Sequence, residues 1–177
     1  GAISSLPTAT LANHTTAVTG AHPGHSGVLH NTWLDRSDGS TPDLLSMEQM
    51  FWSADHLADG VETLFEALGR NRPGATSTAT FEFCDRGATF SSFALVRAGD
   101  GASLPDLADA AHVHAPSAEA SAAYRFMSTV DHLSVEHTVT QWHSALSSGT
   151  RPPALSWVSL AVTDEAGHES GPHGELA

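Results

Sequence analysis

The stretch from Thr150 to His168, TRPPALSWVSLAVTDEAGH, constrains the fold more than any other part of the chain. Pro152 and Pro153 block a helix, and a mostly apolar run then continues to Val162. Such a run is typical of a buried parallel strand, and the polar residues that begin at Thr163 then lie at its carboxyl end. Because open α/β sheets bind ligands at the carboxyl ends of their strands, this unit predicts both a fold class and a place for a site.

The rest of the chain fits an α/β architecture. Small and apolar residues predict a helix over Asn13–Thr19, and apolar spacing over 57–68 predicts a second one. Alternation predicts a strand in the second half of 75–87, and 88–101 is a further strand candidate. The long segment 106–149 is rich in helix formers. We therefore expect one α/β domain.

Charge and hydropathy exclude several classes of function. Twenty acidic residues against seven basic ones give a formal net charge of -13, which repels duplex nucleic acid and anionic lipid. The sequence contains no run of 18 apolar residues, so it predicts no membrane span. The lone Cys84 excludes an internal disulfide and is expected in the core. An anionic substrate would need bound cations to reverse the local charge.

The segment from Pro7 to Asn31, PTATLANHTTAVTGAHPGHSGVLHN, is polar but contains no Asp, Glu, Lys or Arg. Thr10 precedes the expected helix, where free N–H groups and the helix dipole create positive potential. Two interpretations stay open for it: Thr8 or Thr10 is an N-cap, or Thr10 is a nucleophile whose pKa a metal lowers.

Asp164 and His168 form an Asp-x-x-x-His pattern in which a carboxylate and an imidazole can converge on one cation. The spacing alone is weak evidence, because a zinc site needs three or four ligands. The adjacent pairs Asp55-His56 and Asp131-His132 fall in helical stretches, where neighbours do not share a face, so we expect ordinary surface residues there.

Together, two blocks carry a family resemblance. The first resembles the nucleophile motif of the type I phosphodiesterase/nucleotide pyrophosphatase family, in the alkaline phosphatase superfamily. It matches at Pro7, Thr8, Thr10, Leu11, Asn13, His14, Thr16, Val18, Thr19, Gly20, Pro23, Gly27, Val28 and Asn31. The second block, VTDEAGHESGPHG, resembles the strand, Asp-x-x-x-His and Gly-Pro of the same family. The family commonly has His-Gly where this chain has Ser26-Gly27.

The resemblance implies a fold and a set of roles. The fold would be part of an alkaline-phosphatase-like three-layer α/β/α sandwich with a mostly parallel central sheet. Thr10 would be the nucleophile of a phosphoric ester hydrolase, form a phospho-threonine intermediate and ligate one of two divalent metal ions, usually Zn²⁺. Asn31 would donate a hydrogen bond to a phosphoryl oxygen, and Asp164 and His168 would ligate the other metal. Trp33 lies close enough to Asn31 in sequence to line a leaving-group pocket, whereas Asn13 and His14 are expected to brace the nucleophile loop.

The family's remaining metal ligands have no counterpart in the two blocks. We therefore expect residues 1–177 to be a single incomplete catalytic domain, a segment of a longer protein that lacks its first strand and its C-terminal part and is inactive alone. The substrate class stays open among nucleotides, phosphodiesters and related phosphate esters. Two alternatives also stay open: a phosphonate hydrolase of the same family, and a non-catalytic relative that binds phosphate or metal.

Overall fold

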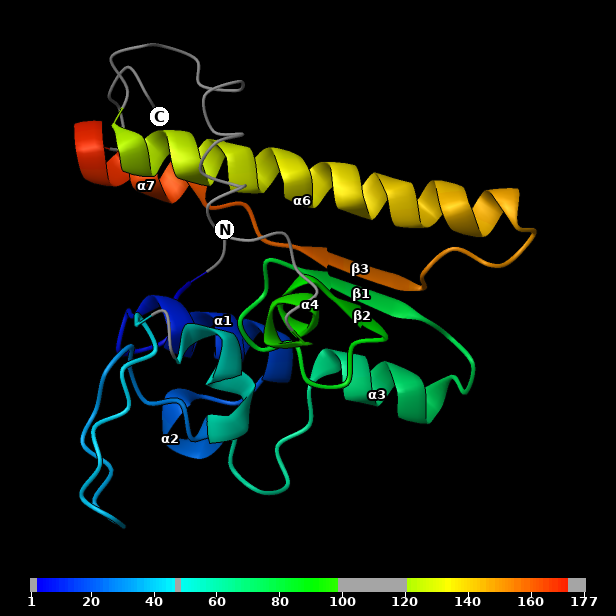
Figure 1. Cartoon of the computed structure of the whole chain (residues 1–177). Helices are drawn as coiled ribbons and strands as arrows, with labels where there is room; N and C mark the ends of the chain where they lie inside the picture. The colour runs from blue at the N-terminus through cyan, green and yellow to red at the C-terminus, as the bar shows by residue number, and fades with distance from the viewer. Residues whose placement is uncertain (1–2, 47–48, 99–120, 172–177) are drawn as a thin grey trace.

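The structure is a computed structural model that describes residues 3–46, 49–98 and 121–171. Helices dominate it, and a small sheet lies between them (Figure 1). The elements in chain order are α1 (Thr10–Thr19), α2 (Pro23–Ser26), the 3-10 helix η1 (Met50–His56), α3 (Leu64–Asn71), β1 (Ser77–Thr80), β2 (Phe90–Ser91), α4 (Ser92–Ala98), α6 (Ala122–Ser147), β3 (Leu155–Val158) and α7 (Val162–Ser170).

The sheet in the described part of the chain has the strand order β2-β1-β3, and both pairings are parallel. Ser77 pairs with Leu155 and Thr80 with Val158, so β1 and β3 run in register over their whole length. The parallel strand predicted after Pro153 is therefore confirmed, and the chain has an α/β fold. The strand is shorter than expected, however, because β3 ends at Val158 rather than at Val162.

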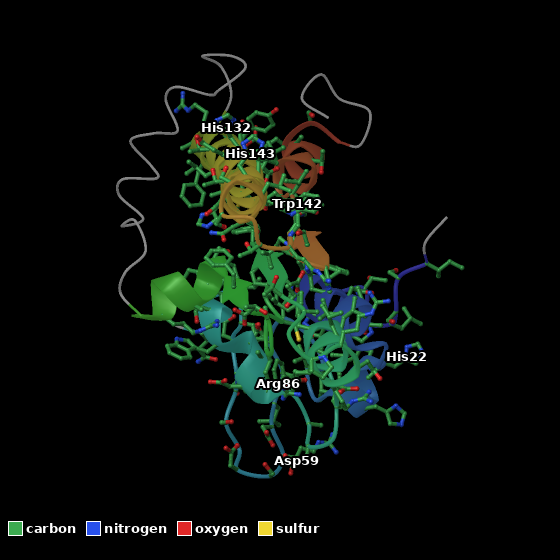
Figure 2. The ribbon with its side chains drawn as sticks, turned by 90° about the vertical axis from the view of Figure 1, so that its right-hand side faces the viewer. His22, Asp59, Arg86, His132, Trp142 and His143 are labelled. Atoms are coloured by element: carbon green, nitrogen blue, oxygen red, sulfur yellow. The ribbon has the colours of Figure 1, made fainter. Side chains whose placement is uncertain are left out.

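Helices cover the sheet on two sides. Figure 1 shows α6 and α7 above the sheet and α3 below it, with α1 and α2 near the end toward which β1 and β3 run. The turned view in Figure 2 places His132 and Trp142 in the α6 layer and Arg86 on the other side of the sheet. Among the described helices, none is long and apolar enough to cross a membrane.

The main hydrophobic core joins α1 and α3 to the sheet. Its most buried large side chains include Leu11, Val18, Phe65 and Phe93, and the free thiol of Cys84 is buried there as expected. A smaller cluster forms between α6 and α7. The nucleophile helix predicted from the sequence is therefore fixed directly against the main core.

The strand predicted in the second half of 75–87 lies in its first half instead. All four residues of β1 are buried, so this strand has no solvent face and shows no alternation of apolar and polar residues. The alternating residues that suggested a strand begin at Phe81, which has a positive φ of 51° and leaves the sheet. The 88–101 candidate yields only the two-residue β2 before α4 begins.

The predicted 57–68 helix is also shorter than expected. A turn at Gly60, with φ of 81°, interrupts the chain before α3. A capping box then starts the helix: the Thr63 hydroxyl accepts from the Glu66 N–H at 3.1 Å, and the Glu66 carboxylate accepts from the Thr63 N–H at 2.9 Å. The long helix expected in 106–149 is confirmed over Ala122–Ser147, and the part of it before residue 121 lies outside the described residues.

Candidate active site

Thr10 is the first residue of α1, three residues earlier than the predicted start of the helix. Ala9 occupies the N-cap position, and its side chain makes no capping hydrogen bond, so the interpretation of Thr8 or Thr10 as the N-cap is wrong. Thr10 is exposed, and within the described residues its hydroxyl takes part in no hydrogen bond. A free hydroxyl therefore stands at the positive end of a ten-residue helix.

Asn31 lies beside the first turn of α1. Its Oδ1 accepts a hydrogen bond from the Leu11 N–H at 2.9 Å, which satisfies one of the N–H groups that a helix start leaves open. An N–H group requires an acceptor, so the amide oxygen faces the helix and Nδ2 remains available to donate elsewhere. The structure thus brings the Asn31 amide next to Thr10 from 21 residues further along the chain.

Asn13 braces the segment that leads into α1, as predicted. Its Nδ2 donates to the carbonyl oxygens of Pro7 and Ala9 at 3.2 and 2.9 Å, and its Oδ1 accepts from the Ser5 N–H at 2.7 Å. One amide side chain therefore fixes three backbone groups on the approach to Thr10. This arrangement limits the positions that the Thr10 backbone can adopt.

His14 braces the helix from its other side, through a buried carboxylate. His14 Nδ1 lies 2.9 Å from Glu82 Oε2, and the His14 ring packs edge-on against Phe83 with centroids 5.2 Å apart. The same Oε2 accepts from the Ser159 hydroxyl at 3.0 Å, and Glu82 Oε1 accepts from the Cys84 N–H at 3.1 Å. We call His14, Glu82, Ser159 and Cys84 the Glu82 network.

Glu82 is fully buried, yet it stays a carboxylate. Burial by itself raises the pKa of Glu82, but the hydrogen bond and charge of His14, with the donors of Cys84 and Ser159, bring it below its ordinary value. Glu82 follows β1 by two residues and Ser159 directly follows β3. The network therefore attaches α1 to the carboxyl ends of two adjacent strands, where α/β sheets place their sites.

Asp164 and His168 lie on α7 rather than at a strand tip, because β3 ends four residues before this helix begins. One helical turn separates them, and Asp164 Oδ2 lies 3.5 Å from His168 Nε2. Each side chain is 74% exposed. Within the described residues, no hydrogen bond or ion pair joins either side chain to Thr10 or Asn31.

The Asp164–His168 pair fits two corners of a zinc site. Two ligands at about 2.0–2.1 Å from a tetrahedral Zn²⁺ are themselves roughly 3.3 Å apart, close to the separation of this carboxylate oxygen and imidazole nitrogen. Across the described ranges, however, no three His, Cys, Asp or Glu residues gather closely enough to hold a metal. These two side chains alone do not make a metal site.

Asp131 is not the surface residue that the sequence predicted. It is 7% exposed, and its two carboxylate oxygens accept from the N–H groups of Ala161 and Val162 at 2.7 and 2.9 Å. A carboxylate placed this way caps α7 and complements its dipole. Asp131, on α6, therefore fixes the start of the helix that carries the Asp164–His168 pair, a role that no local pattern around residue 131 reveals.

The other predicted residues near the site have ordinary partners. Asp55 is exposed, as expected, whereas His56 is half-buried against the Trp33 ring, with centroids 5.3 Å apart in an edge-on arrangement. Trp33 is itself half-buried and packs against the main core. Trp33 is therefore engaged by both His56 and the core.

Comparison with known proteins gives a family match. The model of the type I phosphodiesterase/nucleotide pyrophosphatase family matches residues 2–177. A search of curated proteins found no match. The family match covers both blocks that carried the resemblance and the whole region between them.

Proposed function

The chain belongs to the type I phosphodiesterase/nucleotide pyrophosphatase family, a family of metal-dependent hydrolases, and we propose that Thr10 is the nucleophile in hydrolysis of a phosphate ester. One observation carries this proposal: the hydrogen bond from the Leu11 N–H to Asn31 Oδ1 brings a donor amide beside a free, exposed threonine hydroxyl. The exposed position at a helix start suits attack on a bulky anionic substrate.

The reaction would proceed in two displacements. Thr10 Oγ1 attacks phosphorus, the bond from phosphorus to the leaving oxygen breaks, and a phospho-threonine forms. Water then attacks the same phosphorus, the bond to Thr10 Oγ1 breaks, and the hydroxyl is restored. Asn31 Nδ2 would donate to a non-bridging phosphoryl oxygen in both steps, because its Oδ1 is held by Leu11.

We propose Asp164 and His168 as ligands of one divalent ion, usually Zn²⁺ in this family, and Thr10 as a ligand of a second. A bound divalent ion supplies Lewis acidity and positive charge, which lower a hydroxyl pKa and neutralise a transferring phosphoryl group. The chain carries a net charge of -13, so such charge would offset the repulsion of an anionic ester at this site. The absence of charged residues in the sequence from Pro7 to Asn31 leaves Thr10 and Asn31 without a neighbouring carboxylate in that segment.

The proposal is tested by turnover of p-nitrophenyl phosphodiesters and monoesters by the full-length protein with Zn²⁺ present. We expect Thr10→Ala to lower kcat at least about 1000-fold, the scale of losing a nucleophile. Asn31→Ala should lower it about 100-fold, the scale of losing one preorganised donor. Thr8→Ala is the matched control, since Thr8 is an exposed threonine two residues away, and it should retain normal turnover. Normal turnover by Thr10→Ala would refute the proposal.

A second candidate function follows from the incomplete set of metal ligands. Without three gathered ligands among the described residues, the protein would bind phosphate or metal without turning over an ester. Zn²⁺ titration separates the two functions. Two tight equivalents together with turnover support the hydrolase, whereas weak binding and no turnover of any ester support the non-catalytic relative. Including phosphonoacetate among the substrates tests the phosphonate alternative.

A further inference from the structure

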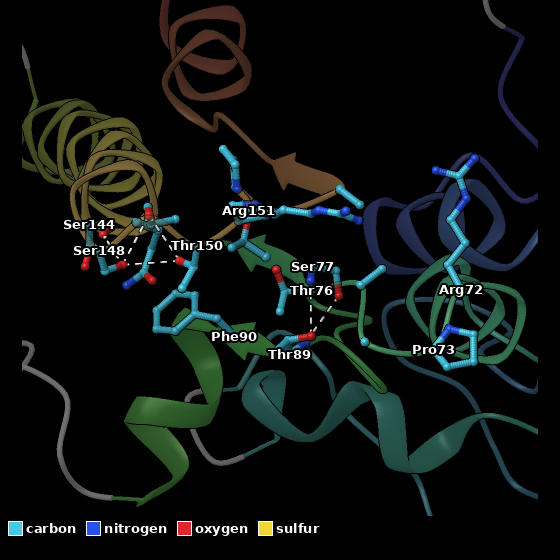
Figure 3. A pocket seen from close by; sticks show the side chains of 18 residues that line it. Arg72, Pro73, Thr76, Ser77, Thr89, Phe90, Ser144, Ser148, Thr150 and Arg151 are labelled. Carbon is cyan, nitrogen blue, oxygen red and sulfur yellow. Dashed lines mark hydrogen bonds between the residues drawn. The ribbon is translucent and has the colours of Figure 1, made fainter.

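A pocket lies at the opposite end of the sheet from Thr10. Its volume is about 1010 Å³, and it is lined by the residues that lead into β1 and β3, the start of β2, the C-cap of α3 and the last turns of α6. Figure 3 shows Thr76, Ser77 and Thr89 between Arg72 on one side and Ser144 and Ser148 on the other. The Glu82 network is at the carboxyl ends of the same strands, so the two sites are separate.

Thr78 gives this pocket an unfilled hydrogen-bonding group. Thr78 is 2% exposed, and its Oγ1 is the one buried side-chain polar atom in the described part of the chain that has no hydrogen-bond partner. Thr80, on the same face of β1, is satisfied by the Thr138 hydroxyl on α6 at 3.1 Å. A buried hydroxyl without a partner costs free energy, so a ligand that reaches it gains a hydrogen bond.

Two arginines give the pocket positive charge. Arg70, Arg86 and Arg97 pair with carboxylates, but within the described residues Arg72 and Arg151 take part in no ion pair and donate no side-chain hydrogen bond. Both line the pocket, and none of the described residues that line it is an aspartate or a glutamate. This is unusual in a chain whose acidic residues outnumber its basic ones by 20 to 7.

The ends of α3 and α6 also lie here, and their terminal carbonyl groups carry partial negative charge. Arg72 is the C-cap of α3, so one explanation of the arginines is that they only offset these dipoles. The guanidinium groups, however, donate to none of the terminal carbonyls. The N–H groups of each guanidinium therefore remain available, and their geometry allows paired hydrogen bonds to two oxygens of a phosphate group.

We propose that this pocket binds a small phosphate ester, with its phosphate held by Arg72 and Arg151 and a ligand oxygen accepting from the Thr78 hydroxyl. The volume exceeds what a free phosphate ion needs and lies in the range of pockets for organic ligands. The ester's organic part then occupies the space between β1 and α6, where the Ser and Thr hydroxyls lie. This assignment is independent of the reaction proposed at Thr10.

Amide chemical shifts of the full-length protein test the proposal, because they separate this pocket from the Thr10 site. The probes are glucose 6-phosphate, inorganic phosphate and glucose. We expect saturable shifts at residues 76–78, 89–90 and 150–154 with glucose 6-phosphate, weaker shifts at the same residues with phosphate, and none with glucose. Shifts confined to the Thr10 region, or equal shifts with glucose, would overturn the proposal. Binding of phosphate without the ester would overturn the ester assignment.

Variants identify the groups that bind. Arg72→Gln and Arg151→Gln should each weaken glucose 6-phosphate binding about tenfold, whereas Arg36→Gln, an arginine outside the pocket, should leave it unchanged. Thr78→Val removes the hydroxyl at nearly constant shape, so we expect weaker binding with an unchanged or raised melting temperature. Weaker binding by Arg36→Gln to the same extent would show that only net charge matters and would refute the site. Unchanged binding by all three pocket variants, Arg72→Gln, Arg151→Gln and Thr78→Val, would also refute the site.

Discussion

Replacing Glu82 is the sharpest test of how α1, the helix that begins at Thr10, is held. The carboxylate is fully buried and accepts three hydrogen bonds, from His14, Ser159 and the Cys84 backbone. In Glu82→Gln the amide oxygen must face the Cys84 N–H, because a backbone donor cannot become an acceptor. The new NH₂ group then faces Ser159, whose hydroxyl can rotate, and His14, which can accept only in one tautomer.

The magnitude follows from these partners. The glutamine variant keeps the three contacts but loses the charge, and charge-assisted hydrogen bonds are roughly twice as strong as neutral ones. We therefore expect Glu82→Gln to lower the free energy of unfolding by about 1–2 kcal/mol. Glu82→Ala leaves the three donors without their acceptor next to a cavity, so its cost should be about 3–5 kcal/mol, as for other broken buried pairs.

Urea unfolding followed by tryptophan fluorescence measures both values. Glu136→Gln is the matched control, because Glu136 also faces a histidine, His132 at 3.9 Å, but is 65% exposed. It should cost less than about 0.5 kcal/mol. A cost below about 0.5 kcal/mol for both Glu82 variants would refute the account of the network.

The same network predicts a pH dependence. Because the pKa of Glu82 is lowered in the folded protein, the unfolded chain takes up a proton first as the pH falls. The stabilisation is therefore fully present above the ordinary glutamate value of 4.5 and is lost as the pH falls through the folded value. The difference in stability between wild type and Glu82→Gln should be constant near pH 7 and shrink below about pH 4.5. A difference that grows with acidity would contradict this sign.

Three further predictions concern a turn, a helix cap and a thiol. Gly27→Ala should cost more than about 3 kcal/mol in urea unfolding and Gly20→Ala only about 1–2 kcal/mol, because both have positive φ but a Cβ at Gly27 would lie 2.4 Å from a backbone oxygen. Equal costs would contradict this steric argument. Asp131→Ala should lower the free energy of unfolding by about 1–2 kcal/mol and reduce the helical circular dichroism, because it uncaps α7. A spectrum and a stability like those of wild type would show that the cap is dispensable. Burial first, and then the neighbouring Glu82 charge, raise the pKa of Cys84 to about 12, so the folded protein should not react with a thiol reagent at pH 8 until it is unfolded. Rapid modification before unfolding would contradict the buried thiol.

Part of the fold could be predicted because its signals are local. The end of α1 follows from Gly20, whose φ of 69° suits a left-handed C-cap, and the long α6 follows from helix-forming composition. The strand position could not be predicted in the same way. A strand covered on both faces, such as Ser77–Thr80, shows no alternation of apolar and polar residues. The residues after it do alternate, so the strand was predicted there instead.

The candidate site also contains residues with a local sequence signal and residues without one. Thr10 and Asn31 stand in a recognisable block, whereas Glu82 acts on His14 from 68 residues away and on Ser159 from 77 residues away. Nothing near Glu82 in sequence distinguishes it from a surface acid in a strand. Asp131 was missed for the same reason, because its partners on the α7 backbone lie 30 and 31 residues further along.

The central claim is that Thr10 carries the phosphoryl group during turnover, and trapping that intermediate tests it most directly. The full-length protein is incubated with a p-nitrophenyl phosphodiester and Zn²⁺, quenched in acid within the first turnovers, and digested for peptide mass spectrometry. We predict a phosphoryl adduct on Thr10 in the peptide that begins before α1, and no adduct in Thr10→Ala. Turnover without any adduct on Thr10, or with the adduct on another residue, would contradict the account.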